Sequence, residues 1–182
     1  MPDYRRYRIA NHPRFITLVT ANRVAALVEH WPALRSAFRM VQASQPFELD
    51  AMVILPDHCH LILTLPSGEV DCVTRINQIK GAFSRAVPDL APISQSRQRR
   101  GERGVWQRRY WERILMDEDD YRRHFNYLHY NPVKHGHVAA CRDWPYSTFH
   151  RCVEWGIYGR DWGIGGMPAE IQMSVKPMSD LL

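Results

Sequence analysis

The segment 56–65 carries two histidines one residue apart at the start of an apolar run. Side chains alternate between the two faces of a β-strand, so His58 and His60 are expected to point the same way and Cys59 the other way. Two imidazoles on one face can hold a divalent metal ion and leave its other coordination positions open. A hydrogen-bonded histidine pair without a metal would give the same motif, so the function depends on what the rest of the chain brings to this strand.

Hydrophobic periodicity predicts three further strands and two amphipathic helices around this segment. The expected strands cover 15–20, 47–55, 58–65 and 106–116, and the expected helices run from Trp31 to before Gln45 and over about 70–86. The order strand, helix, strand, strand, helix, strand is typical of an α+β, ferredoxin-like (RRM-like) antiparallel sheet with both helices on one face. The other face is then free to carry a site.

A third helix is expected after the last strand. Asp117 can cap its N-terminus, and the acidic residues after it favour the positive end of the helix rather than a metal site. The helix is predicted to stop near Asn131, because Pro132 disfavours helical geometry in the residue before it. Later aromatic residues are expected to pack as a C-terminal extension.

Tyr127 and Asn131 are four residues apart and therefore share one face of that helix. If this face lies over His58 and His60, a phenol, an amide oxygen and two imidazoles meet in one small volume. Two nitrogens, one oxygen and open positions suit Mg²⁺ or Mn²⁺. Tyr127 would then be the nucleophile that attacks a phosphodiester and forms a covalent phosphotyrosine. Tyr130 is a rival nucleophile, and His124 could accept the phenol proton, although a surface histidine is the simpler interpretation.

The net charge of +5 comes largely from arginine, which binds phosphate through a planar fork. The chain begins with Arg5, Arg6 and Arg8, and a second cluster contains Arg97, Arg99, Arg100, Arg103, Arg108 and Arg109. Tyrosines and tryptophans lie between these arginines. Basic residues interleaved with aromatic ones are typical of proteins that bind single-stranded nucleic acid.

Length and composition indicate one domain spanning residues 1–182. The stretch 88–104 lacks apolar periodicity and is expected to be a mobile loop, and 165–182 a loosely ordered tail. There is no membrane-length apolar run and no secretory signal at the N-terminus. The four cysteines form no Cys-x-x-Cys pair, so we expect a reduced, cytoplasmic protein, associated with the nucleoid if it binds DNA.

Five blocks of sequence, in this order, resemble the REP-associated tyrosine transposases, single-tyrosine members of the HUH nuclease superfamily that are related to small insertion-sequence transposases. The resemblance spans about residues 4–162, and its blocks are Tyr4-Arg5-Arg6-Tyr7, Leu55-Pro56-Asp57-His58-Cys59-His60, Trp106-Gln107-Arg108-Arg109-Tyr110-Trp111-Glu112, Tyr127 to Gly136, and Asp143 to Arg151.

The resemblance implies that His58, His60 and Asn131 bind Mg²⁺ or Mn²⁺ and that Tyr127 is the nucleophile. It implies a substrate as well: single-stranded DNA with an imperfect hairpin, the repetitive extragenic palindrome, cut to leave a 5′-phosphotyrosine and a 3′-hydroxyl. The N-terminal arginines would hold the hairpin base, Arg108 and Arg109 would also contact DNA, and the protein would act as a monomer. The loop 88–104 is longer than we expect for close relatives, so its arginines could make a different DNA contact or none.

Two other functions remain compatible with the residues. A phosphoesterase could use His58 and His60 directly, although a histidine-triad hydrolase would want a third alternating histidine where Ile62 stands. A non-catalytic hairpin-binding module could present a ferredoxin-like sheet to nucleic acid, although such sheets display aromatic residues on their open face. Binding that is unaffected by chelator and unaccompanied by nicking would favour the binding module.

Overall fold

The computed structural model of the chain describes residues 9–90 and 92–172. Its strands are β1 (Arg14–Val19), β2 (Glu48–Ile54), β3 (His58–Thr64) and β4 (Trp111–Ile114). Its helices are η1 (Ala21–Arg23), α1 (Trp31–Ser44), α2 (Cys72–Ala86), α3 (Gln95–Gln98), α4 (Glu118–Lys134), η2 (Cys141–Asp143), α5 (Phe149–Glu154) and α6 (Ala169–Gln172).

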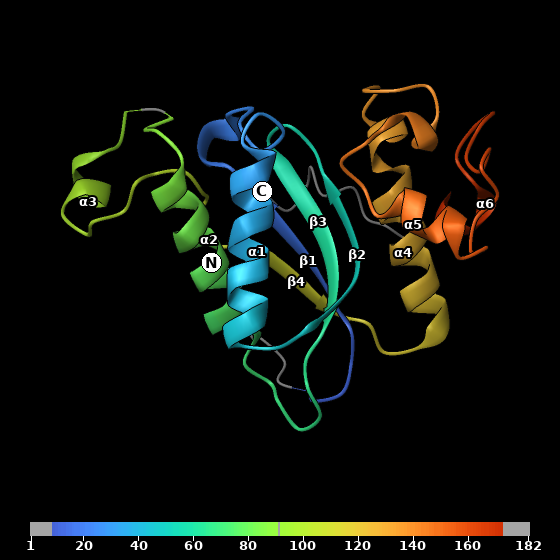
Figure 1. Cartoon of the computed structure of the whole chain (residues 1–182), viewed down its shortest axis with the longest axis horizontal. Helices are drawn as coiled ribbons and strands as arrows, with labels where there is room; N and C mark the ends of the chain where they lie inside the picture. Colours follow the sequence, from blue (N-terminus) through green and yellow to red (C-terminus); the bar gives the residue numbers. More distant parts are fainter. Residues whose placement is uncertain (1–8, 91, 173–182) are drawn as a thin grey trace.

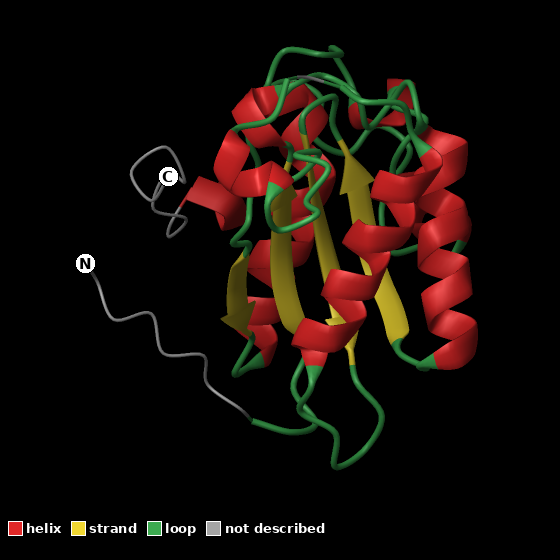
Figure 2. Ribbon diagram, turned by 90° about the vertical axis from the view of Figure 1, so that its left-hand side faces the viewer, coloured by secondary structure: helices red, strands yellow, loops and turns green. Residues whose placement is uncertain are grey.

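The four strands form an antiparallel sheet in the order β2-β3-β1-β4. Helices α1 and α2 run along one face of this sheet, and α4 and α5 lie beyond the other face (Figures 1 and 2). This arrangement confirms the expected ferredoxin-like α+β fold. It also shows that the second face is covered by the C-terminal half of the chain rather than left open.

Both faces of the sheet are buried, which explains why its strands are nearly continuous in apolar residues. Ile16 and Leu61 pack into the core beneath α1 and α2, whereas Phe15 and Ile62 pack into the core beneath α4. Leu128 contributes to the second core from α4 and is fully buried. The face that carries His58 and His60 is therefore a packed interface with α4.

Helix α4 begins as expected but ends later than expected. The side chain of Asp117 accepts a hydrogen bond from the Asp120 backbone N–H (2.7 Å), which confirms the N-cap. The predicted stop near Asn131 is wrong, because the helix includes Pro132 and continues to Lys134.

The true end of α4 is a Schellman motif one turn beyond the proline. The N–H of His137 bonds to the carbonyl of Pro132 and that of Gly136 to the carbonyl of Val133 (both 2.9 Å), with Gly136 at φ +71°. Pro132 disfavours helical geometry at Asn131, but this is only a preference. The helix therefore continues to its Schellman motif.

The fourth strand is shorter than the predicted 106–116. Trp106 makes one isolated bridge with Thr20, and the regular ladder begins only at Trp111. The side chains of Trp106 and Tyr110 point into the core beneath α1 and α2. Lys80 of α2 donates hydrogen bonds to the carbonyls of residues 107 and 108, at 2.8 and 3.2 Å, so these two carbonyl oxygens are not paired with a neighbouring strand.

The stretch 88–104 contains a helical turn, α3, which the sequence analysis did not predict. Gly104 lies at φ +70° against Ile93, and a Cβ atom there would stand 2.2 Å from the Ile93 side chain. Glycine at this position therefore permits the two ends of the α3 segment to approach closely. In the predicted loose tail the structure has the short helix α6, and 173–182 lie outside the described residues.

Among the described residues, none of the helices combines the length and apolar character that crossing a membrane requires. The four cysteines are free thiols and all are buried. Burial raises the pKa of the Cys59 thiol to about 12 and that of Cys141 to about 11. These thiols are therefore packing residues rather than reactive groups.

Candidate active site

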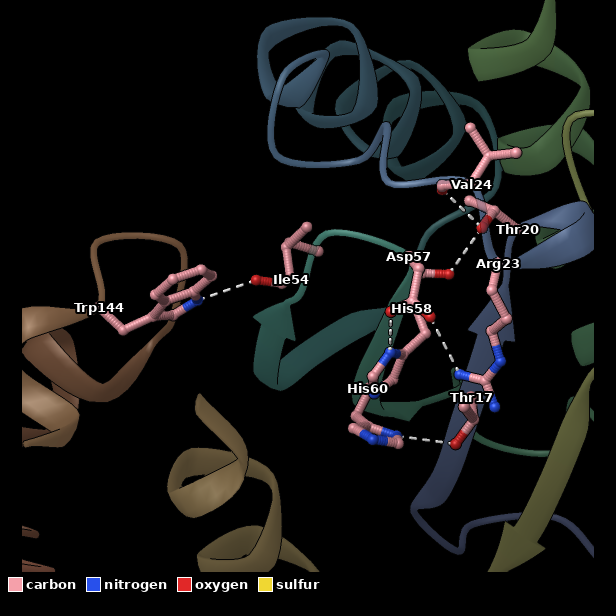
Figure 3. Close-up of polar contacts among 9 residues, drawn as sticks. All are labelled: Thr17, Thr20, Arg23, Val24, Ile54, Asp57, His58, His60 and Trp144. Atoms are coloured by element: carbon pink, nitrogen blue, oxygen red, sulfur yellow. Dashed lines mark hydrogen bonds and ion pairs between the residues drawn. The ribbon is translucent and has the colours of Figure 1, made fainter. Parts of the chain in front are cut away.

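His58 and His60 project from the same side of β3, as their spacing predicts (Figure 3). Their ring centroids lie 5.1 Å apart, and both side chains are buried. The strand register places Thr17 of β1 opposite His60 and Val19 opposite His58. Cys59, between the two histidines, belongs to the core on the other face of the sheet.

Each histidine has one ring nitrogen engaged by a neighbouring side chain. His58 Nδ1 donates a hydrogen bond to Asp57 Oδ1 (2.6 Å), and His60 Nδ1 lies 2.8 Å from Thr17 Oγ1 (Figure 3). In this arrangement Nε2 of each ring is the nitrogen left for coordination, as in metal sites whose histidines are oriented by carboxylates or other polar groups. Asp57 and Thr17 were not predicted as site residues, and only the strand register could have indicated Thr17.

The Asp57 carboxylate is suited to this orienting role. Burial alone would raise its pKa, but the hydrogen bond and charge of His58, together with Arg23, lower the pKa of Asp57 to about 2. Arg23 Nη1 lies 3.3 Å from Asp57 Oδ2. Asp57 is therefore ionised throughout the range in which the protein would work.

Helix α4 brings Tyr127 over the histidine pair. The ring centroids of Tyr127 and His60 are 5.7 Å apart, and Phe15 fills the space beside both rings. Tyr127 is 4% exposed. The ring that the sequence analysis named as nucleophile thus lies against the strand that it was expected to face.

Asn131 has a buried oxygen atom that lacks a partner. Its Nδ2 donates to the carbonyl of Tyr127 (3.0 Å), which fixes the side chain. Its buried Oδ1 makes no hydrogen bond of good geometry among the described residues, although the Asn131 side chain lies close enough to His60 to raise the pKa of that ring. An unpaired buried acceptor destabilises the fold by about 1–3 kcal/mol. A cation bound beside His60 would satisfy such an oxygen.

His60 is held in its neutral form. Burial lowers its pKa well below the ordinary value, and repulsion between a protonated His60 and the ionisable side chains of His58, His135 and Lys134 lowers it further, while a hydrogen bond with the Asn131 side chain acts in the opposite direction. Neutral imidazole is the form that coordinates metal ions. The described residues contain no group of three or more His, Cys, Asp or Glu side chains that could hold a metal ion.

Lys134 contacts the phenol of Tyr127, which the sequence analysis missed. Its Nζ donates a hydrogen bond to Tyr127 Oη (3.1 Å) and lies 4.5 Å from the ring centroid. Residues 127, 131 and 134 follow the i, i+4, i+7 pattern of one helix face, so their spacing could have predicted that Lys134 lies near Tyr127. This prediction was not made, because Lys134 shares that face only if the helix continues through Pro132.

The neighbouring candidates take other positions. Tyr130 packs against Trp162, with ring centroids 6.3 Å apart, on the side of α4 that meets the C-terminal segments. His124 is buried rather than on the surface, with Nδ1 2.8 Å from the carbonyl oxygen of Asp120. His135 was given no role, yet its ring centroid lies 5.2 Å from that of His58.

Three of the predicted DNA-binding arginines, Arg5, Arg6 and Arg8, lie outside the described residues. Arg108 and Arg109 are exposed and line a groove beside α3. Trp106 and Tyr110, which alternate with these arginines in the sequence, are buried, so the expected display of stacking aromatics at this stretch is wrong.

The family is established by comparison with known proteins. Residues 10–131 match the family described as transposase, IS200-like. The chain belongs to this family of transposases.

Within that family its relatives are more narrowly defined. An Escherichia coli K12 protein, a REP-associated tyrosine transposase, is 40% identical over 163 residues, which cover 89% of this chain and 91% of the relative. A Haemophilus influenzae relative, provisionally assigned to the same group, is 41% identical over 165 residues, covering 90% and 94%. A solved REP-associated tyrosine transposase bound to a REP hairpin is 40% identical with a TM-score of 0.78, covering 89% of this chain and 91% of that one. The resemblance found in the sequence is confirmed: the chain is one of the REP-associated tyrosine transposases.

Proposed function

We propose that this transposase nicks and rejoins single-stranded DNA carrying a REP-type hairpin, with Tyr127 as the nucleophile. The observation that carries the proposal is the meeting of three groups across the α4–β3 interface: the Tyr127 ring, the neutral His60 imidazole and the unpaired Asn131 oxygen. The solved relative bound to a REP hairpin supports the same class of DNA as substrate.

The reaction is a phosphoryl transfer in which the number of phosphodiester bonds is conserved. The phenol oxygen of Tyr127 attacks the scissile phosphorus, a phosphorus–tyrosine bond forms, and the bond to the 3′-oxygen breaks. The phenol proton is lost and the departing 3′-oxygen gains a proton, which leaves a 5′-phosphotyrosine and a 3′-hydroxyl. Attack of a 3′-hydroxyl on the phosphotyrosine reverses these steps and joins strands.

The residues present fit a divalent cation, Mg²⁺ or Mn²⁺, held by His58, His60 and Asn131. The ion would supply charge neutralisation at the scissile phosphate. Asp57 and Thr17 orient the two imidazoles, and burial keeps His60 neutral so that a nitrogen lone pair is available. Phe15 and Leu128 pack around the site and limit the access of water.

The proposal predicts a covalent protein–DNA complex. Incubation with a labelled single-stranded REP hairpin and Mn²⁺ is expected to give a species that survives boiling in detergent, together with a shorter strand ending in a 3′-hydroxyl. The same hairpin as part of a fully paired duplex should give neither product. Hairpin binding without either product, at every metal concentration tested, would instead identify a binding module that no longer cuts.

Lys134 is proposed as the residue that stabilises negative charge on the Tyr127 oxygen during attack. Lys134→Gln is expected to slow adduct formation by about a hundred- to a thousandfold, the scale for losing one donor to an oxyanion. Lys134→Arg keeps the positive charge and should retain most of the rate. The measurement is the single-turnover rate of adduct formation with saturating DNA and metal.

Comparison of the two variants separates this role from simple packing, because they differ in charge at the side chain that contacts the Tyr127 oxygen. Equal deficits for the Gln and Arg variants would show that Lys134 serves only to pack against Tyr127.

A further inference from the structure

The strongest unexplained feature outside the active site is an open groove beside α3. It encloses about 560 Å³ and is lined by Ser94, Ser96, Arg97, Gln107, Arg108 and Arg109. Helix α3 projects from the layer formed by α1 and α2, on the opposite side of the sheet from α4 (Figure 1). The groove is therefore a site separate from Tyr127 and the histidines.

The groove is held in shape by hydrogen bonds to the body of the protein. Arg97 Nη1 donates to the carbonyl of Trp106 (3.1 Å), and the indole of Trp106 donates to the carbonyl of Lys80 (3.1 Å). Arg103 ties the same segment to the end of α2 through the carbonyl of Ser84 (2.6 Å). The arginines of the groove are thus presented from an anchored segment.

The groove carries an excess of positive charge. Its three arginines face one nearby carboxylate, Glu102, which lies 3.1 Å from Arg108 Nε and 3.9 Å from Arg97 Nη1. Arg109 is exposed and has no hydrogen-bond or ion-pair partner among the described residues. Guanidinium groups with serine hydroxyls and a glutamine amide between them are donors suited to phosphate oxygens.

The position of the aromatic residues decides which part of a nucleic acid this groove can bind. Trp106 and Tyr110 are only 5% and 6% exposed and belong to the core beneath α1 and α2. They cannot stack on bases from that position, although stacking is how single strands are held by their bases. The groove therefore offers donors for phosphates and no aromatic surface for bases.

We infer that this groove binds the phosphodiester backbone of the DNA substrate, independently of its sequence and at a distance from the cleavage site. The inference rests on the proposed function for the identity of the nucleic acid as DNA. The backbone could belong to the hairpin stem or to its single-stranded flank, and both present the same phosphates.

The test is a binding titration that does not depend on cleavage. Fluorescence anisotropy in chelator is measured with three labelled DNAs: a bare hairpin, a hairpin with a single-stranded flank, and the flank alone. Arg109→Ala is expected to weaken binding severalfold and to lower the salt slope by about one. Arg108→Ala with Arg109→Ala should lower the slope by about two.

The chain offers a matched control in the same loop. Arg99 and Arg100 are exposed and do not line the groove, so Arg99→Ala with Arg100→Ala removes the same charge without touching it. This control should lose less affinity and less salt slope than the groove variant, because neither side chain lines the groove where the phosphates would bind. If it weakens binding as much as the groove variant, general charge rather than the groove is responsible and the inference is wrong.

A gain of affinity gives a result that misfolding cannot imitate. Glu102→Gln frees Arg97 and Arg108 from their carboxylate, and it should tighten binding by up to about fivefold.

For the groove variants, a loss of affinity confined to DNAs that share the stem, or to those that share the flank, identifies the element bound. Scrambling the base sequence of that element should leave the loss unchanged. Wild-type affinity of the groove variants for all three DNAs, while wild type still forms its adduct, would overturn the inference but not the proposed function.

Discussion

Replacing Tyr127 with phenylalanine is expected to abolish the covalent complex while leaving hairpin binding in place. The change removes the one oxygen through which the proposed phosphotyrosine forms, and loss of a nucleophile lowers the rate by more than about a thousandfold. The phenylalanine ring keeps its contacts with Phe15 and His60. Only the hydrogen bond from Lys134 is lost, at a cost of about 1 kcal/mol in unfolding free energy. A denaturing gel with labelled hairpin and Mn²⁺ measures the adduct directly.

Tyr130→Phe is the matched control for that experiment. Tyr130 lies on the same helix and is also buried, but it faces Trp162 and the backbone of Gly163 rather than the histidines. This variant should form the adduct at close to the wild-type rate. An adduct that persists in Tyr127→Phe and disappears in Tyr130→Phe would show that Tyr130 is the nucleophile and that the assignment to Tyr127 is wrong.

The geometry of the histidine pair could be predicted because it depends on local rules. Alternation along β3 puts His58 and His60 on one face whatever the rest of the chain does. The four-residue spacing of Tyr127 and Asn131 is equally local. The expectation that β3 and α4 meet came from the strand and helix order typical of the ferredoxin-like fold, and the structure confirms that order.

Two contacts of the site were missed, one because it is long-range and one because the end of α4 was misplaced. Thr17 reaches His60 only through the β1–β3 register, which pairs residues 43 positions apart. Lys134 depends on α4 continuing through a proline, and a closing motif beyond the proline decides that.

The prediction that the aromatic residues near Arg108 stack on bases was wrong because these side chains are buried. In sequence, Trp106 and Tyr110 look like surface residues interleaved with arginines, but Lys80 and the α2 core hold this segment out of the strand. Composition alone does not tell which side chains of an irregular segment turn inward. The arginines remain exposed, so the correction changes the expected contact from bases to phosphates rather than removing it.

Removal of the metal ion, or of the Asn131 oxygen that would help to hold it, is expected to have the second-largest effect. Adduct formation should stop in chelator and return when Mn²⁺ is added. Asn131→Ala should raise the metal concentration needed for half-maximal binding by about ten- to a hundredfold, the range for losing a group that supports a metal site. Isothermal titration of Mn²⁺ into DNA-free protein measures this without relying on activity.

His135→Ala is the informative comparison, because its ring lies beside His58 but is not part of the proposed donor set. Burial, with the charges of His58 and Lys134, lowers the pKa of His135 to about 4, so the wild-type side chain is neutral near pH 7 and its removal changes no charge there. Its metal titration should therefore match wild type. If His135→Ala weakens Mn²⁺ binding as much as Asn131→Ala does, the ion is held by three imidazoles instead. If Asn131→Ala titrates like wild type, the unpaired amide oxygen has another partner, and the ligand set derived from the α4–β3 interface is wrong.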